Sequence, residues 1–418
     1  MTVRANQLAG LSAAIERVGR LDVPADTLLT AFFRANAAMG QRDRAFVAEG
    51  AYAYLRRKRS LDALSATADP HKLALSVLVR ELGLSVRDLQ PVLANDDAAW
   101  LADFKFRAQS ALPAAIAADL PDWLWERLCS VNGESEAMAM ARGLQTPAPL
   151  DLRVNPLKTT REKALAALRD ESFDASATPF APLGIRIAGR PSLVNHPWLA
   201  DGCLEVQDEG SQLIGLLVAP RRSDMVVDFC AGAGGKTLLL GALMRSQGRL
   251  YAFDVKAKRL AKLTPRLARS GLSNVHPQLI AHERDVKVKR LAEKIDRVLV
   301  DAPCTGFGTL RRNPDLKWRQ TPADVDELAA KQTRILGSAA TLVKPGGRLV
   351  YATCSVLPEE NDAIVAGFVA AHPHFVQSDV SAELAKAGIG LDTGPSLRLL
   401  PHRHGCDGFF AAILERTK

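Results

Sequence analysis

The segment VDAPCTG at residues 300–306 and the segment YATCS at residues 351–355 are built alike. Each follows a short apolar run of the kind found in buried strands, and each then breaks into a loop that carries a cysteine. In a parallel α/β sheet, the ligand crevice lies outside the carboxyl ends of the strands. Two such strands would direct Asp301, Cys304 and Cys354 into one pocket, which suits nucleophilic catalysis on an electrophilic ring carbon.

A glycine-rich segment, DFCAGAGGKT at residues 228–237, follows another apolar run and opens a helical pattern. Its glycines let the backbone approach a ligand closely, and the helix that follows offers unpaired N–H groups. Two common phosphate-binding patterns each fail by one residue. A P-loop requires glycine where Cys230 stands, and the dinucleotide-binding fingerprint requires glycine or alanine where Thr237 stands.

S-adenosylmethionine is the third class of ligand for such a loop. Its carboxylate and amine suit a glycine-rich turn flanked by an acid, and its ribose diol needs a carboxylate at the end of the second strand. Asp254 ends the segment YAFD and stands where that acid is expected. Asp285 follows the third predicted strand and could accept a hydrogen bond from the adenine amine. A structural glycine turn with surface acids is the alternative.

Strands and helices alternate from residue 224 onward, which predicts a parallel sheet with crossover helices. This part of the chain is therefore expected to be an α/β domain. The predicted strands are 225–229, 250–254, 275–279, 298–301, 349–351, a weaker 375–380, and 409–414.

The regions before this domain differ in pattern. Apolar residues recur at helical spacing in the first part of the chain, which should be all-helical. The next part should be a small α+β unit, with a helix at 160–168 and short strands at 150–154, 185–187 and 193–194. The sequence thus predicts three domains, with boundaries at 1–138, 139–218 and 219–418.

The segment AYAYLRRKR at residues 51–59 sets aromatic and apolar residues beside four successive cations. One interpretation is a helix that faces RNA phosphates. The other is a solvated helix face whose cations complement the carboxyl end of the helix dipole. The pattern alone favours neither.

Composition restricts the class of protein. The chain has 418 residues, a formal net charge of +8 and 47% hydrophobic residues, as expected for a globular protein that binds a polyanion such as RNA. A basic enzyme with no nucleic-acid partner would look the same. Six scattered cysteines without a C-x-x-C pair indicate reduced thiols, no zinc ribbon and a cytoplasmic location. No apolar signal core or membrane span is evident.

Several motifs occur in order between about residue 200 and the end of the chain. They include QDEGS (207–211), DFCAGAGGKT (228–237), DAPCTG (301–306), RNPDLKW (312–318), KPGG (344–347), ATCS (352–355) with EEN (359–361), and residues 399–410. This region resembles the RsmB/NOP/Sun family of RNA cytosine-5 methyltransferases. The first helices more weakly resemble the NusB-like RNA-binding domain of the bacterial RsmB branch. Ala233 departs from the family pattern, which has proline there.

The resemblance implies a class I methyltransferase fold: a Rossmann-like, seven-stranded, mostly parallel sheet whose last strand is antiparallel. It also implies a role for each cysteine. Cys354 would add to carbon 6 of cytosine and make carbon 5 nucleophilic, and Cys304 would help to release the enzyme. Asp301 would bind the ring near nitrogen 3 and stabilise charge there. Lys236 or backbone donors would activate the Cys354 thiol.

The resemblance also names the cofactor and the partner. S-adenosylmethionine is expected to contact Cys230, Ala231, Gly232, Ala233, Gly234, Gly235, Lys236, Asp254, Asp285 and Asp301. The substrate should be structured RNA, with rRNA favoured by the RsmB branch and tRNA left open, and the protein should be a monomer. No metal site is expected, although HRHGCD at residues 402–407 groups possible ligands.

Two other interpretations are weighed against this one. An amino-methyltransferase acting on adenine would need a D/N-P-P-Y/F motif where residues 301–304 read DAPC. A non-catalytic RNA-binding assembly factor would not need both cysteines and Asp254. Alone, each cysteine would be read as a small buried hydrophobic residue.

Overall fold

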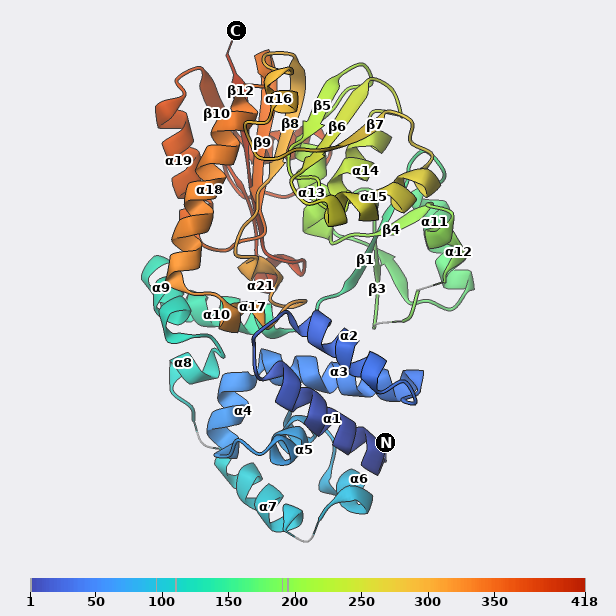
Figure 1. Cartoon of the computed structure of the whole chain (residues 1–418), viewed down its shortest axis with the longest axis vertical. Coiled ribbons are helices and arrows are strands. Elements are labelled where there is room, and N and C mark those ends of the chain that lie inside the picture. The colour runs from blue at the N-terminus through green and yellow to red at the C-terminus, as the bar shows by residue number, and fades with distance from the viewer. Residues whose placement is uncertain (1, 95, 110, 190, 194, 418) are drawn as a thin grey trace. The chain divides into compact units, whose positions relative to one another are not determined.

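The computed structural model describes residues 2–417 except residues 95, 110, 190 and 194. It divides into two compact units (Figure 1). The first comprises Met1–Pro147 with Thr309–Thr321, and the second comprises Ala148–Gly308 with Pro322–Lys418. The chain therefore leaves the second unit after Gly308, contributes thirteen residues to the first, and returns. The predicted division into three domains stays a prediction.

The first unit is all-helical, as the sequence predicts. Its core is formed mainly where α1, α3 and α5 pack together, with Leu11, Leu55 and Leu75 fully buried. Its helices are α1 (Ala5–Val18), α2 (Ala25–Ala35), α3 (Gln41–Arg56), α4 (Lys58–Ser65), α5 (Pro70–Arg80), α6 (Val86–Leu89), α7 (Asp97–Arg107), α8 (Ala114–Ala117), α9 (Asp122–Asn132), α10 (Glu134–Gln145) and α17 (Leu316–Arg319).

The four successive cations at residues 56–59 do not form a free surface. Each pairs with a carboxylate of the same unit, and Arg56 is only 5% exposed. Arg56 lies in the last turn of α3, as the helix-dipole interpretation expects, and the other three side chains are 23–31% exposed while held in ion pairs, so both interpretations stay predictions. The ion pairs are Arg56–Glu49, Arg57–Glu81, Lys58–Asp62 and Arg59–Asp122.

The second unit contains a small antiparallel sheet in the order β2-β3-β1-β4. The strands predicted at 150–154 and 185–187 are confirmed, whereas β2 and β4 were not predicted. Leu193 lies outside any strand, and Val194 lies outside the described residues. The elements are β1 (Leu150–Val154), α11 (Arg161–Asp170), β2 (Ala175–Ala177), β3 (Gly184–Ile187), α12 (Pro197–Ala200) and β4 (Leu204–Val206).

The large sheet of the second unit has the order β10-β12-β9-β8-β5-β6-β7, with β11 paired to β12. Strands β5 to β9 run parallel, and β12 is antiparallel to both of its neighbours, as predicted for the last strand. The strands are β5 (Met225–Asp228), β6 (Arg249–Asp254), β7 (Val275–Leu279), β8 (Ile295–Asp301), β9 (Val343–Thr353), β10 (Phe375–Ser378), β11 (Leu397–Leu399) and β12 (Phe409–Arg416). The predicted class I fold is confirmed.

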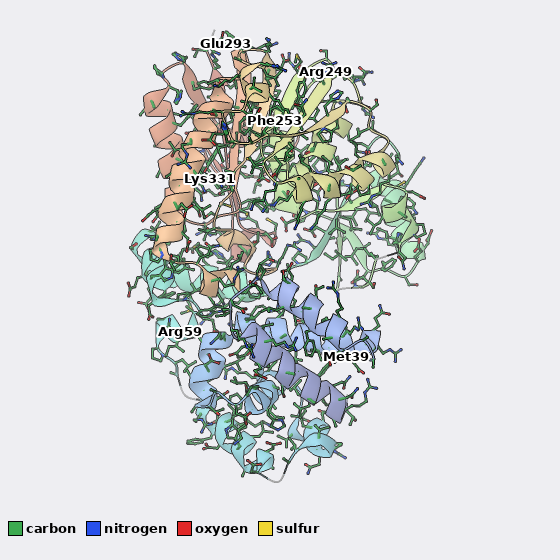
Figure 2. All side chains as sticks on the ribbon, viewed as in Figure 1. Met39, Arg59, Arg249, Phe253, Glu293 and Lys331 are labelled. Carbon is green, nitrogen blue, oxygen red and sulfur yellow. The ribbon has the colours of Figure 1, made fainter. Side chains whose placement is uncertain are left out.

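Successive residues of a strand point to opposite sides of the sheet. Apolar side chains occur on both sides of this sheet, and helices cover both faces. Val226 belongs to a core layer with α13, α14, α15 and α20, and Val227 belongs to the layer with α18 and α19. Phe253, labelled in Figure 2, is fully buried in the second layer. The helices are α13 (Glu209–Leu217), α14 (Gly235–Leu243), α15 (Ala257–Ser270), α16 (Val286–Lys289), α18 (Pro322–Ala340), α19 (Asp362–Ala371), α20 (Val380–Lys386) and α21 (Pro401–His404).

Parallel pairing brings four strand ends to one edge of the sheet. Asp228, Asp254, Asp301 and Thr353 are the last residues of β5, β6, β8 and β9. Asp301 lies in register with Ala352, two residues before Cys354. The loops that carry chemistry in the sequence therefore leave the sheet at the same edge. In the part of the chain that the structure describes, no helix has the length and apolarity needed to cross a membrane.

Candidate active site

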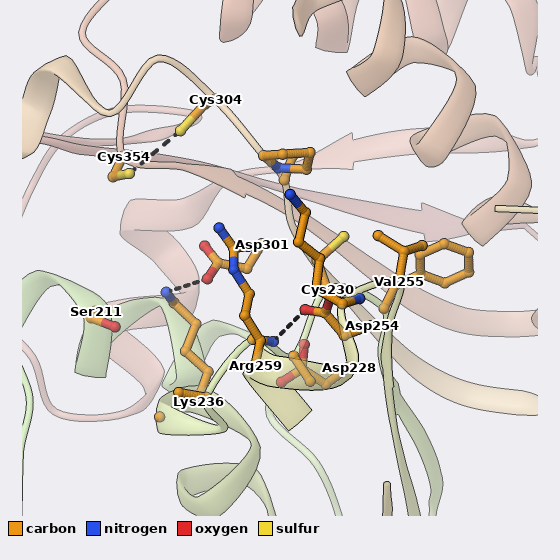
Figure 3. A pocket seen from close by; sticks show the side chains of 18 of the residues that line it. Ser211, Asp228, Cys230, Lys236, Asp254, Val255, Arg259, Asp301, Cys304 and Cys354 are labelled. Carbon is orange, nitrogen blue, oxygen red and sulfur yellow. Dashed lines mark hydrogen bonds and ion pairs between the residues drawn. The ribbon is translucent and has the colours of Figure 1, made fainter. Parts of the chain in front are cut away.

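A cavity of about 670 Å³ opens at the carboxyl edge of the large sheet (Figure 3). Asp301, Cys304 and Cys354 all line it, together with most of the glycine loop. The two cysteine loops, which lie fifty residues apart in the chain, thus meet at one place. The wall includes the loop residues Cys230, Ala231, Gly232, Ala233, Gly235 and Lys236, and also Asp228 and Asp254.

The glycine loop turns sharply before α14. Gly232 and Gly234 have φ angles of 57° and 85°, a region that glycine adopts without strain. A Cβ at position 234 would also come within 2.2 Å of the Leu263 side chain. The Gly232 N–H donates to Asp254 Oδ2 at 2.9 Å, so the acid predicted for the ribose also holds the loop.

Two arginines outside the loop hold its carbonyl groups. Arg153 of β1 donates to the Gly235 carbonyl at 2.7 Å, and Arg266 of α15 donates to the Ala233 carbonyl at 2.7 Å. Burial lowers the pKa of Arg153 to about 10, so it remains a cation at neutral pH. Glu205 of β4, which is 5% exposed, pairs with Arg266 and thereby fixes its guanidinium.

No local pattern in the sequence indicates the contact of Arg153, because Arg153 stands 82 residues before Gly235. Arg153 and the nearby Asn155 both serve the backbone of the fold. Asn155 donates to the backbone carbonyls of Gly202 and Ser270, so it is also structural.

Asp228 lies beneath the loop at the end of β5. Its Oδ2 accepts a hydrogen bond from Thr237 Oγ1 at 2.6 Å, and burial raises its pKa to about 7. Its second oxygen, Oδ1, has no hydrogen-bond partner of ordinary geometry among the described residues. Since Asp228 lines the cavity, this oxygen is available to a cationic group of a ligand.

Lys236 extends from the start of α14 to Asp301. Its Nζ donates to Asp301 Oδ2 at 2.8 Å. Burial by itself would lower the pKa of Lys236, but the Asp301 carboxylate raises it by charge and hydrogen bonding, and the net shift is upward. The side chain is therefore a permanent cation, and a negative charge on Cys354 would stabilise it further.

The two cysteines face each other across the cavity wall. Their sulfur atoms are 3.4 Å apart. The hydrogen bond to Cys354 raises the pKa of Cys304 well above its ordinary value, and burial raises it further. Cys304 therefore keeps its proton at neutral pH, and either thiol can be the donor in the contact between the two sulfur atoms. Gly308 N–H donates to the Cys354 carbonyl at 2.9 Å, which ties the two loops together.

Glu360, at the end of a short 3-10 turn, holds the loop of Cys304 from behind. Its Oε1 accepts hydrogen bonds from the Thr305 N–H at 2.8 Å and from Gln332 Nε2 at 2.9 Å. Its Oε2 accepts one from Thr305 Oγ1 at 2.5 Å. Glu360 is fully buried. In the sequence, Glu360 stands only within the EEN motif at residues 359–361, and no local pattern there indicates this role.

Two of the predicted cofactor residues do not line the cavity. Gly234 belongs to the glycine loop but does not line the cavity. Asp285 caps α16 by accepting hydrogen bonds from the N–H groups of Ala281 and Lys287, at 2.8 and 2.9 Å. Glu283 of the same turn does line the cavity, as do Arg259 and Lys331, none of which was predicted.

Comparison with known proteins identifies the family. Residues 215–415 match the family described as 16S rRNA methyltransferase RsmB/F, and residues 120–193 match the RsmF/B-like ferredoxin-like domain. A probable ribosomal RNA small subunit methyltransferase B from Synechocystis is 37% identical over 301 residues, which cover 71% of this chain and 67% of that protein. The chain belongs to the RsmB/F methyltransferase family. The resemblance seen in the sequence is thereby confirmed.

Other members of the family agree with this assignment. The protein described as probable ribosomal RNA small subunit methyltransferase B of Bacillus subtilis is 31% identical, over 71% of this chain and 66% of its own length. The matches thus span about two thirds of the curated relatives. Among solved structures, PH0851 covers 100% of both chains with a TM-score of 0.78 and 25% identity. A methyltransferase homologue from Pyrococcus horikoshii covers 72% of this chain and 97% of its own, with a TM-score of 0.62 and 28% identity.

Proposed function

We propose that this protein transfers a methyl group from S-adenosylmethionine to carbon 5 of a cytosine in RNA, with rRNA as the favoured substrate. One observation carries the proposal: two thiols lie 3.4 Å apart in a cavity that a glycine loop and Asp301 also line. An enzyme that methylates a ring nitrogen has no need of a second thiol. Methylation of carbon 5 needs one group to attack the ring and another to complete its release.

The residues that line the cavity match the chemical groups of the cofactor. Asp228 Oδ1 is buried and has no hydrogen bond of ordinary geometry among the residues that the structure describes, and it would suit the ammonium group of the cofactor. Asp254 can accept from the ribose hydroxyls, although it also holds the loop through Gly232. Backbone groups of residues 230–236 would lie against the amino-acid part. When bound, S-adenosylmethionine would supply an electrophilic methyl group on a sulfonium.

The side chains then have separate tasks. The Cys354 sulfur would form a bond to carbon 6, which moves electron density to carbon 5. Asp301, held by Lys236 at 2.8 Å, would bind the ring near nitrogen 3 and stabilise the charge that develops there. Lys236 would also favour the thiolate of Cys354.

Cys304 would act after methyl transfer. In the resting pair it holds a proton against Cys354. The Cys304 thiol would first release this proton to solvent, and its raised pKa makes the resulting thiolate a strong base. The thiolate would accept the proton from carbon 5, and the electrons of that C–H bond would restore the double bond between carbons 5 and 6. The bond between carbon 6 and Cys354 would then break with its electron pair leaving on the Cys354 sulfur, and the methylated base would be released.

Covalent trapping tests this proposal. The Cys304→Ala protein, mixed with total RNA and S-adenosylmethionine and then denatured, should run on a gel as a protein–RNA adduct. The adduct should be absent from the Cys304→Ala/Cys354→Ala protein. The matched control is Cys406→Ala, which removes a fully buried thiol outside the cavity and should leave no adduct.

Each result decides one part of the proposal. Sequencing the trapped RNA distinguishes rRNA from tRNA as the substrate. Methylation by the wild-type protein without any adduct in Cys304→Ala would contradict the assigned roles of the cysteines. Cofactor binding without methylation of any RNA would support an RNA-binding assembly factor instead. The proposal also includes a cytoplasmic location and a monomeric state. Sedimentation of the purified protein would test the monomeric state.

A further inference from the structure

Helix α15 and its flanks carry an unbalanced positive charge. Residues 255–282 contain six lysines and arginines and no aspartate or glutamate. Four of these cations, Lys256, Lys258, Arg259 and Lys262, are exposed. None of the four side chains forms an ion pair or a hydrogen bond with any residue in the described part of the chain. This distinguishes them from the cations at residues 56–59, which are all paired.

The cations of α15 form one stripe. Arg259, Lys262, Arg266 and Arg269 recur at spacings of three, four and three residues, which places them on one face of the helix. Lys258 stands four residues before Lys262 and belongs to the same face. Leu260 and Leu263 lie on the buried side and attach α15 to the core. Glu205 pairs with both Arg266 and Arg269, so the carboxyl half of the stripe is partly neutralised and held in place. The unpaired charge is concentrated in the amino half.

The amino half of the stripe reaches the active site. Lys256 and Arg259 both line the cavity that contains Asp301 and Cys354. Figure 3 shows the Arg259 side chain reaching into this cavity. Lys258 and Lys262 continue the stripe along the helix but do not line the cavity.

We propose that the α15 stripe binds the phosphate backbone of the RNA strand that carries the target cytosine. Arg259 would bind a phosphate next to the nucleotide in the cavity, and Lys258 and Lys262 would bind phosphates further along. This inference rests on the proposed function and adds to it the path of the substrate. Backbone contacts of this kind fix the register of the nucleic acid without reading its sequence.

The surface of α15 favours RNA over an acidic protein. Protein interfaces depend on a few large anchors, mostly aromatic side chains and arginine, that fill pockets on the partner. The exposed positions between the cations are Ala257, Ala261, Thr264, Pro265 and Ala268, and α15 exposes no aromatic or large aliphatic side chain. A stripe of cations without aromatic anchors suits a partner that offers mainly charge, such as a phosphate backbone.

The test compares two variants of equal charge change. Lys258→Gln/Lys262→Gln removes two cations of the stripe that do not touch the cofactor cavity. The matched control, Lys289→Gln/Arg290→Gln, removes two exposed cations at the end of α16 that also lie outside the cavity wall. Binding of each protein to a 16S rRNA transcript would be measured by filter retention over a range of salt concentrations, and binding of S-adenosylmethionine by calorimetry.

The size of the effect follows from counterion release. Each phosphate contact to a single strand contributes a slope of about −0.7 to log K against log salt. Losing two contacts should make the slope shallower by about 1.4 and weaken binding about 25-fold at 0.1 M salt. The stripe variant should also show a raised KM for RNA with little change in kcat. Cofactor affinity should stay unchanged in both variants, and the control should bind RNA within about 2-fold of wild type.

Equal RNA binding by the stripe variant and the control would overturn the inference. So would a stripe variant that binds RNA normally but no longer retains poly-glutamate, because that result would assign the stripe to an acidic protein. A third result separates the two proposals. If RNA binding depends on the stripe but the wild-type protein methylates no RNA, the role of the stripe in RNA binding stands and the proposed reaction is rejected.

Discussion

Replacing Glu360 tests whether this buried carboxylate orders the loop that carries Cys304. The carboxylate accepts the Thr305 N–H at 2.8 Å, and a hydrogen bond to a charged acceptor is worth about 1.5–3 kcal/mol. Glu360→Ala removes this bond entirely, so the opening of the loop at Thr305 should become about 10- to 150-fold more frequent. Glu360→Gln keeps a neutral acceptor and should lose only about half of the bond energy, or about 3- to 12-fold.

Hydrogen exchange at the Thr305 amide is the direct assay. Mass spectrometry of peptides that together cover residues 299–308 would report the exchange of the Thr305 and Ala302 amides in the wild type and in the two variants. The Ala302 amide is an internal reference, because it is bonded to the Ala352 carbonyl in the sheet and should not change. Asp362→Asn is the matched control variant, since Asp362 lies two positions away and, among the described residues, forms an ion pair only with the half-exposed Arg398.

The expected order of exchange rates is Glu360→Ala, then Glu360→Gln, then wild type and Asp362→Asn together. A folded Glu360→Ala protein whose Thr305 amide exchanges as slowly as in the wild type would refute the reasoning. The proposed mechanism adds a second readout: a loosened Cys304 should slow release, so Glu360→Gln should accumulate the covalent RNA adduct while both cysteines are still present.

Three further substitutions test the cofactor side of the cavity. Lys236→Met removes the cation 2.8 Å from Asp301, so RNA methylation measured by tritium transfer should fall by about 100-fold or more. A loss of less than about 5-fold would contradict the role assigned to the Lys236–Asp301 pair. Arg266→Met should weaken binding of S-adenosylmethionine about 10-fold by calorimetry, whereas Arg269→Met, which pairs with the same glutamate but not with the loop, should have little effect. Asp228→Asn should change how stability depends on pH. The Asp228 pKa is raised from 3.8 to about 7, because burial favours the protonated form. Measured by thermal unfolding, the folding stability of the wild type should fall by on the order of 4 kcal/mol relative to that of the variant as pH rises from about 4 to 7. A stability difference that stays constant at all pH values would argue against the shift.

The large sheet could be predicted because its central parallel strands, β5, β6, β8 and β9, are buried on both faces for most of their length and therefore appear as apolar runs, whereas the edge strand β7 is only partly buried. The strands at 225–229, 250–254 and 275–279 were found within one residue of their bounds. The strand expected to reach 380 ends at Ser378, because Asp379 accepts from the Ala382 N–H and begins α20. Strands β2, β4 and β11 have three residues each, too few to show alternation.

Residues that stand at strand ends could be placed in the cavity from sequence, because the topology brings those ends together. Asp254, Asp301, Cys304 and Cys354 are of this kind, and all four line the cavity. Glu360, by contrast, accepts a hydrogen bond from the N–H of Thr305, which stands 55 positions earlier in the chain. Such a contact depends on how distant elements pack, and no local pattern in one sequence encodes it.

The glycine loop shows how packing replaces a local constraint. Ala233 stands where the family pattern has proline, so the loop lacks the fixed φ angle of a proline ring. Contacts from three other elements hold it instead: the carboxylate of Asp254 after β6, and the guanidinium groups of Arg153 from β1 and Arg266 from α15. Two of these act on carbonyl groups, which a proline would not hold. The stiffness of this loop therefore depends on the small sheet that supplies Arg153 and on Glu205 of β4, which orients Arg266. Cofactor affinity should accordingly be sensitive to the packing of that sheet, although no residue of β1 lines the cavity.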